Sequence, residues 1–246
     1  NMGWMNDFLE YMHMDPYFRA NNHGRLTFSM QYAYSENFIQ VLSHDEVVHG
    51  KCSMIEKMPG EYEEKFANLR TAYGFMYGHP GKKLLFMGQE FAQFREWSEK
   101  RSLDWELLDY DMHQKMQAYV RELNKLYEKY DAMYVNDCEP IGFEWMSCDN
   151  ADMSTVSFVR RGSSSKNQLL FVCNFTPVSY EKYRTGVPCA GDYVKVLSSD
   201  DEKFGGTGAN IKKTIKAEKI ECEGKDYSIE FNLPPMSVTV FKFDYK

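Results

Sequence analysis

Acidic and imidazole side chains are concentrated in residues 44–51, directly after a short apolar run. His44, Asp45 and Glu46 come first, and a second histidine and a lysine follow within the same eight residues. At the carboxyl end of a parallel strand, such side chains leave the core and can meet a substrate. We therefore interpret Asp45 as part of an active site. The alternative is that the acids only cap the next segment, and the motif alone does not decide between the two.

A metal site is a further alternative for the same segment. A zinc-binding His-Glu-x-x-His helix needs two histidines four residues apart, whereas His44 and His49 are five apart. Five residues leave two side chains about 140° apart on a helix, and on a strand they put them on opposite faces. We therefore expect neither a metal ion nor a cofactor in this segment.

The first half of the chain alternates between helical and extended patterns. Apolar residues at helical spacing predict helices over 4–17, 26–34, 62–77 and 111–130, and short apolar runs predict strands over 38–43 and 83–87. Both strands end at polar residues, a pattern typical of a parallel α/β sheet or barrel. About two strand–helix units are visible, which is too few to close a barrel.

The pattern changes near residue 132. Beyond it, short β-like runs separated by turn residues lie at 156–159, 169–174, 192–197, 227–233 and 238–243. Many short strands at this spacing favour an antiparallel sandwich. We therefore predict an α/β fold class followed by all-β, with one domain over 1–132 and a second over 133–246.

Composition limits the classes of partner and the compartment. The formal net charge of −7 argues against nucleic acid or an anionic membrane as the main partner, but it does not hinder a neutral ligand such as a sugar. Six cysteines without a Cys-x-x-Cys pair indicate reduced thiols in a cytoplasmic protein. No apolar run reaches the ~18 residues of a membrane span. The first residues do not look like a natural beginning, so we expect a longer parent protein.

Several motifs occur together in the first half of the chain. They are Leu-Ser-His-Asp-Glu at 42–46, Val-Val-His-Gly-Lys at 47–51, Gly-Gln-Glu-Phe at 88–91 and Ser-Leu-Asp-Trp at 102–105. Together they resemble the C-terminal part of a glycogen (1,4-α-glucan) branching enzyme of the α-amylase superfamily. The resemblance covers essentially all of 1–130 and continues more weakly to the end. It implies the last part of a catalytic (β/α)8 barrel, followed by a C-terminal antiparallel β-sandwich.

The resemblance also implies roles for individual residues. Asp45 maps onto the third catalytic carboxylate, which stabilises the oxocarbenium-like transition state, and His44 onto a donor of hydrogen bonds to the same sugar. Trp4 and Trp105 are weaker candidates for stacking on glucose, with core packing as the alternative for each. The other substrate-binding residues expected are Glu46, Gln89, Glu90 and Trp97. Gln89 and Glu90 are expected at the rim of the site, and core packing is the alternative for Trp97 as well.

Two parts of the family's catalytic machinery have no counterpart in this sequence. The nucleophile's Arg-x-Asp-Ala context and the acidic glutamate that follows it do not occur, so we expect both upstream of Asn1. The resemblance thus implies a fragment of an enzyme that transfers α-1,4-glucan chains to α-1,6 branches in glycogen biosynthesis, inactive alone. The alternatives are a non-catalytic carbohydrate-binding or structural module and an α-glucan hydrolase of the same superfamily. An incomplete barrel would leave apolar faces uncovered, so we also expect self-association.

Overall fold

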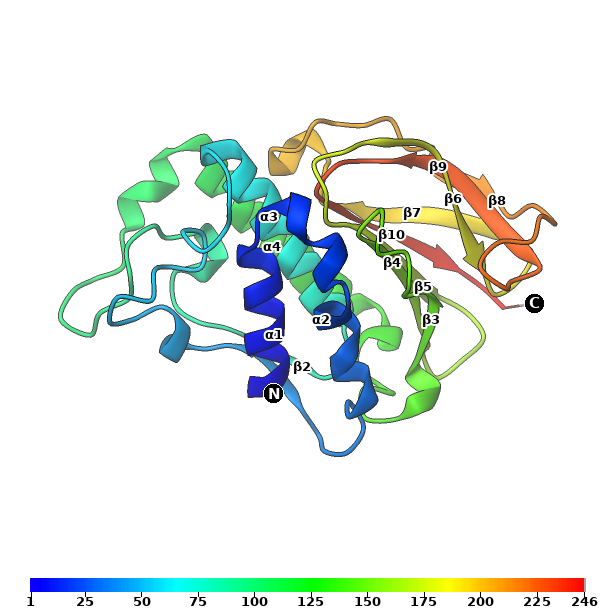
Figure 1. Ribbon diagram of the computed structural model, residues 1–246, viewed down its shortest axis with the longest axis horizontal. Helices are drawn as coiled ribbons and strands as arrows, with labels where there is room; N and C mark the ends of the chain where they lie inside the picture. Colours follow the sequence, from blue (N-terminus) through cyan, green and yellow to red (C-terminus); the bar gives the residue numbers. More distant parts are fainter. Residues whose placement is uncertain (246) are drawn as a thin grey trace.

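The structure is a computed structural model that describes residues 1–245, with a helical half followed by a β-rich half (Figure 1). The first half contains α1 (Met2–His13), α2 (Gly24–Thr27), β1 (Ile39–Leu42), α3 (Tyr62–Gly78), β2 (Lys82–Leu85) and α4 (Asp111–Lys129). The second half contains β3 (Phe143–Ser147), β4 (Thr155–Arg160), β5 (Gln168–Asn174), β6 (Tyr180–Val187), β7 (Asp192–Ser198), β8 (Thr214–Lys216), β9 (Tyr227–Leu233) and β10 (Ser237–Phe243).

Helix α3 lies at the centre of the molecule. A capping box starts it: Glu61 caps the first turn, and the Glu64 side chain accepts the Glu61 amide at 2.8 Å. The helix ends at Gly78, because His79 is extended, as expected for a residue that precedes a proline. Residues 70–78 are all buried, so the second half of α3 is covered on every side, whereas its first turn is exposed. Its neighbours are α4 and the strands β5 and β10.

Strands β1 and β2 run parallel, with α3 as the connection between them. Ile39 pairs with Lys82, and Leu42 pairs with Leu85. Both predicted strands are therefore confirmed, each a little shorter than predicted. The predicted first helix is also confirmed, but α1 ends at His13 because Pro16 starts a separate turn.

The β-rich half is a sandwich, which confirms the predicted all-β part. Its main sheet has the order β3-β4-β5-β10-β7-β8, and β6 and β9 form a second, two-stranded sheet. Side chains of β5 alternate between two cores: Phe171 packs toward α3, whereas Leu170 and Val172 pack toward β6 and β9. The main sheet is therefore a middle layer between the helices and the small sheet (Figure 1).

Three strands were not predicted from the sequence. Strand β6 carries charged residues and a register shift, β8 has three residues, and β3 lies at the edge of the sheet. Short, polar or edge strands lack the apolar alternation on which the prediction relied.

Candidate functional site

The first polar turn of the candidate site follows β1 directly. Leu42 is fully buried, and the chain then turns through a 3₁₀ helix at His44–Glu46. His44 Nε2 lies 3.1 Å from Asp45 Oδ1, and the Ser43 hydroxyl is 3.4 Å from Asp45 Oδ2. The side chains of His44 and Asp45 are 55% and 56% exposed. The predicted pair therefore lies together at the carboxyl end of a parallel strand, open to solvent.

The end of β2 is attached to the end of β1 by one buried side chain. Gln89 donates from Nε2 to the Leu42 carbonyl at 3.1 Å, and its Oε1 accepts the Phe86 amide at the same distance. The Gln89 carbonyl accepts the Tyr73 hydroxyl, and burial holds the pKa of that hydroxyl well above its usual range. Because Gln89 is buried and both ends of its amide bond to backbone groups, it joins the two strand ends.

Glu90 is partly buried on the same turn as Gln89. Within residues 1–245 it makes no hydrogen bond or ion pair with Asp45. The two predicted acids therefore lie on neighbouring strand ends without touching each other.

An aromatic contact connects the first turn to the loop after β2. The His44 ring lies 5.7 Å from the Phe86 ring, and Phe86 meets Trp97 edge-on at 5.1 Å, measured between ring centroids. The Trp97 amide donates to the Val47 carbonyl at 3.0 Å. Trp97 is thus partly buried beside the His44–Asp45 pair, where part of its surface remains exposed.

The other two tryptophans of this half differ from each other. Trp4 is 1% exposed and stacks on Phe8 at 4.9 Å, so the expectation that it stacks on glucose is wrong. Its position in α1 directs the ring into the core. Trp105 is 52% exposed and rests on Phe91, so one of its faces is available to a ligand.

Glu46 is paired with two lysines. Its carboxylate lies 3.1 Å from the Lys51 ammonium and 3.7 Å from that of Lys57. These residues line a groove of about 440 Å³ between α1 and the loop after β1, together with His13. The structure therefore places Glu46 in this groove, one residue after the His44–Asp45 pair.

Glu96 is a residue of this site that the sequence analysis missed. Its carboxylate accepts the Gly50 amide at 3.0 Å and the Cys52 amide at 2.7 Å. These two bonds lower the pKa of Glu96. His49, Gly50 and Cys52 all have positive φ, and Glu96 stabilises this unusual backbone. The sequence around it, Arg-Glu-Trp at 95–97, carries one signal for this contact, the glutamate directly before Trp97.

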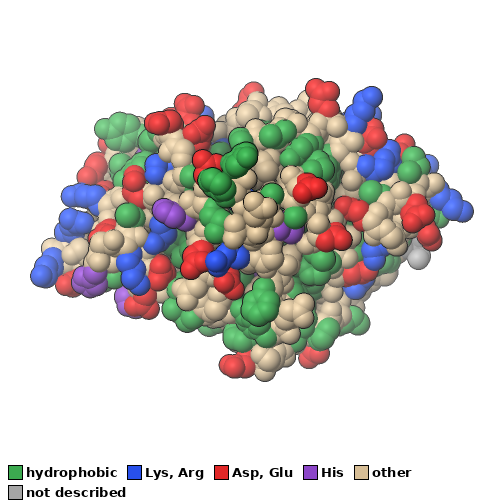
Figure 2. Space-filling view, in the orientation of Figure 1, with side chains coloured by type: hydrophobic (Ala, Val, Ile, Leu, Met, Phe, Trp, Pro, Cys, Tyr) green, Lys and Arg blue, Asp and Glu red, His purple; other side chains and the backbone are tan. Residues whose placement is uncertain are grey.

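The loops after β1 and β2 together form one end of the molecule. Figure 2 shows histidine, lysine and arginine side chains gathered with acids over this end, at the left. Among residues 1–245, no three histidine, cysteine, aspartate or glutamate side chains are arranged to hold a metal ion. No helix in the same range is long and apolar enough to cross a bilayer.

Comparison with known proteins shows which folds the chain is similar to. Residues 145–244 match the family described as alpha amylase, C-terminal all-beta domain. A debranching enzyme from Nostoc punctiforme superposes with a TM-score of 0.51 at 14% identity, covering 80% of this chain and 34% of that one. Ttha1563 from Thermus thermophilus superposes with a TM-score of 0.52 at 16% identity, covering 78% of this chain and 33% of that one. At such low identity, the two solved structures show a shared fold alone.

Relatives of higher identity identify the family. The chain is 54% identical over its whole length to a 1,4-alpha-glucan branching enzyme of Butyrivibrio fibrisolvens and spans 38% of that protein. It is 52% identical over 98% of its length to one from Halothermothrix orenii, again spanning 38%. It is 48% identical over 99% of its length to one from Aquifex aeolicus and spans 39% of that protein. The chain belongs to the family of 1,4-alpha-glucan branching enzymes and corresponds to a C-terminal portion of them.

Proposed function

We propose that the chain is part of an enzyme that transfers α-1,4-glucan chains to form α-1,6 branches in glycogen biosynthesis. The observation that carries this proposal is the exposed His44–Asp45 pair at the end of β1, in a chain whose whole length matches branching enzymes. Asp45 would stabilise the oxocarbenium-like transition state, since a carboxylate lowers the energy of positive charge at the anomeric carbon. His44 would donate a hydrogen bond to a hydroxyl of the same sugar.

The chain by itself offers one side of such a site. Transfer by double displacement needs a second and a third carboxyl group, of which the nucleophile and the acid lie about 5–5.5 Å apart. The neighbouring Glu46 is engaged by two lysines and faces another groove, so it does not supply either group. We therefore expect no branching by the isolated chain. Incubation with amylose should leave the long-wavelength absorbance of its iodine complex unchanged, and an appreciable loss would contradict this expectation.

The remaining predicted contacts with substrate fall into two groups. Trp97 and Glu90 lie on the loops around the strand ends, with side chains that are partly exposed, so we propose that they contact the glucan. Gln89 and Glu46 are engaged by protein groups. We propose that Gln89 affects glucan binding indirectly, by holding the two strand ends in place. We propose that Glu46 affects it through the groove beside the strand ends.

Binding of maltoheptaose to the chain tests the proposal. We expect measurable heat of binding in a calorimetric titration, and at least a several-fold loss of affinity in Asp45→Asn and Trp97→Ala. Lys115→Ala is the matched control, because Lys115 forms an exposed ion pair within α4. Equal affinity of wild type and Asp45→Asn would contradict the assignment of the site.

A non-catalytic carbohydrate-binding function is the second candidate. It is favoured by the exposed face of Trp105, because aromatic faces bind sugars without any catalytic group. This candidate predicts the opposite ranking in the same titration: Trp105→Ala would lose affinity, and Asp45→Asn would keep it.

We also infer that the chain is cytoplasmic and that it self-associates when isolated. The second inference depends on exposed apolar residues. Ile39 and Leu84 on the open face of the β1–β2 sheet are 46% and 37% exposed, and Met87 beyond β2 is 57% exposed. Apolar positions of a parallel sheet are normally covered on both faces. We expect light scattering to show a mass that rises with concentration, and a monomer at high concentration would contradict this inference.

A further inference from the structure

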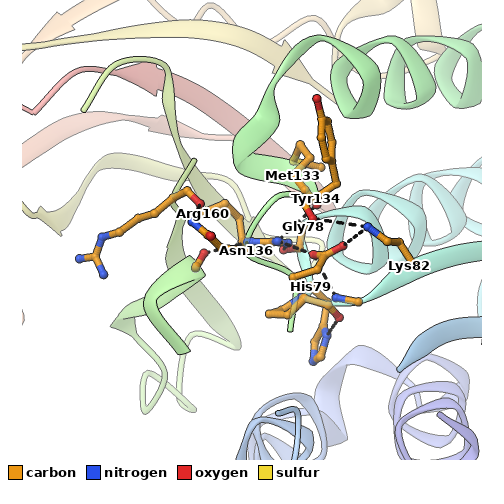
Figure 3. A network of polar contacts seen from close by, with 12 residues as sticks. Gly78, His79, Lys82, Met133, Tyr134, Asn136 and Arg160 are labelled. Atoms are coloured by element: carbon orange, nitrogen blue, oxygen red, sulfur yellow. Dashed lines mark hydrogen bonds and ion pairs between the residues drawn. The ribbon is translucent and has the colours of Figure 1, made fainter. Parts of the chain in front are cut away.

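A buried carboxylate holds the turn that precedes β2. It lies in the segment between α4 and β3, residues 130–142, which we call the linker. Asp137 has a side chain that is 2% exposed. Its Oδ1 accepts from Arg160 Nη2 at 2.6 Å and from the Gly81 amide at 3.1 Å, and its Oδ2 lies 3.3 Å from Lys82 Nζ. Figure 3 shows this network between the linker, the sandwich and the turn. One carboxylate therefore joins three separate segments.

Arg160 extends the network from the sandwich to the end of α3. It lies on β4, its side chain is fully buried, and its Nη1 donates to the Gly78 carbonyl at 2.9 Å. Its other nitrogens donate to the carbonyls of Met133 and Gly142 at 3.3 Å. Carbonyls in the last turn of a helix have no partner within the helix, so Arg160 satisfies one of them from another layer of the fold.

The turn held by Asp137 is also the place where both strands begin. The Lys82 amide donates to the Phe38 carbonyl at 3.1 Å, and Gln40 Nε2 donates to the Pro80 carbonyl at 2.7 Å. Gly81 has φ +102°, and a Cβ atom there would lie 2.9 Å from the Phe38 carbonyl oxygen. The turn is therefore packed directly against the start of β1, and its position determines where β2 starts relative to β1.

The strands are so short that a shift of their first residues also shifts the candidate site at their carboxyl ends. Each has four residues, and the two pair in register along their full length. At about 3.3 Å per residue, the turn and the strand ends are separated by roughly 13 Å of extended backbone. Gln89 joins the far ends, so the pair is held at both ends. An extended, paired strand has no loop in which a displacement of its start could be absorbed.

We propose that Asp137 and Arg160 are positioning residues for the glucan site at His44–Asp45, a role that rests on the proposed function above. The sandwich determines the positions of the first residues of β1 and β2 through the turn at 78–81. It thereby determines the relative positions of the carboxyl ends of the two strands. A buried ion pair suits this task, because its short, directional bonds specify geometry that apolar packing leaves less defined.

The test compares two carboxylates of the same linker. Asp137→Asn removes the charge that faces Arg160 and Lys82. Asp131→Asn is the matched control, because Asp131 accepts the amide and hydroxyl of Ser163 in the sandwich and makes no contact with β1 or β2. Both variants are examined by amide NMR, with shifts and hydrogen exchange read at Leu42, Asp45 and Gln89, and by calorimetry with maltoheptaose.

We expect Asp137→Asn to shift the amides at the strand ends, to speed their exchange, and to weaken maltoheptaose binding several-fold. Asp131→Asn should change only amides near residue 163. Arg160→Lys, which keeps the charge but loses the planar fork, should lie between wild type and Asp137→Asn, and it takes the place of Asp137→Asn if that variant does not fold.

A folded Asp137→Asn whose changes stop at residues 78–82 and 133–142, with unchanged strand-end amides and affinity, would overturn the proposal. If the wild-type chain binds no maltoheptaose, the proposed function fails, and the NMR comparison still decides whether the sandwich positions the strand ends.

Discussion

The two ends of the β1–β2 pair differ sharply in their surroundings. At the starting end, Asp137 and Arg160 are almost completely buried, and each polar contact is made by another protein group. At the carboxyl end, His44 and Asp45 are more than half exposed, and their mutual contact is their main one. In parallel α/β folds the starting end of the strands serves stability, and the carboxyl end serves chemistry. The same contrast between a buried starting end and an exposed carboxyl end is present here, with only two strands.

This contrast shows where substitutions should change stability and where they should change only ligand binding. The starting end holds buried charges that depend on one another, so losing one of them leaves another unpaired. The carboxyl end is open to water, so its charges can change at little cost to folding. Substitutions at the two ends should therefore be separable by experiment.

The largest effect is expected at Arg160. Arg160→Met leaves the Asp137 carboxylate buried without its main partner, and we expect a loss of about 3–5 kcal/mol in the free energy of unfolding. Denaturant unfolding measures it. The double variant Asp137→Leu with Arg160→Met should be more stable than Arg160→Met alone, because no buried carboxylate is left unpaired and the Lys82 ammonium, which loses Asp137, is 55% exposed. A loss below about 1 kcal/mol for Arg160→Met would show that the network adds little to folding.

The next effect is expected at Gly81. Gly81→Ala puts a side chain at a positive φ and against the Phe38 carbonyl, so we expect a loss of about 1–3 kcal/mol. Gly24→Ala is the matched control, because nothing lies within 4 Å of a Cβ atom there. Its stability should stay within about 0.5 kcal/mol of wild type or increase. Equal effects at the two positions would show that the turn is not held tightly.

Acid should reduce the contribution of Asp137 to the free energy of unfolding in a defined pH range. Burial raises the pKa of Asp137, but Arg160 and Lys83 more than offset this and hold it below its ordinary value. Burial lowers the pKa of the nearby His79 to about 3, so that ring stays neutral. A carboxyl with a lowered folded pKa adds stability that is complete above its unfolded pKa of about 3.9 and is lost as pH falls through the folded value.

The stability difference between wild type and Asp137→Asn should therefore be constant from about pH 5 to 7 and should shrink below about pH 4. Unfolding curves of both proteins across this range measure it. A difference that does not change down to pH 2 would contradict the ionised state of Asp137.

The smallest effect on stability is expected at the carboxyl end. Asp45→Asn should change the free energy of unfolding by less than about 0.5 kcal/mol, because the side chain is exposed and its partners are partly hydrated. Thermal or denaturant unfolding measures this change. A loss of 2 kcal/mol or more, roughly the scale of a buried network, would show that the two ends are not separable.

Much of this arrangement could be predicted from local sequence patterns. Apolar periodicity predicted α3, α4 and both parallel strands, and the resemblance to branching enzymes located His44 and Asp45. The buried role of Gln89 and the loop contact of Glu96 could not be predicted, because each joins residues more than 40 positions apart. The pair of Asp137 and Arg160 likewise joins a linker to a strand, and no local pattern marks either residue.

The division of the chain at residues 132 and 133 remains a prediction. Helix α3 shares one apolar core with Phe171 of β5 and Val238 of β10, so the helical half and the sandwich are packed together across that division. Sequence patterns show where the periodicity changes from helical to extended. They do not show that the two parts bury the same surface, which depends on contacts between distant residues.

The most direct test is an amide NMR titration of the chain with maltoheptaose. We expect shift changes centred on residues 42–46 and 86–97, saturating with ligand, and largely absent in Asp45→Asn. Changes confined to residues 145–244, with the same affinity in wild type and Asp45→Asn, would contradict a glucan site at the ends of β1 and β2.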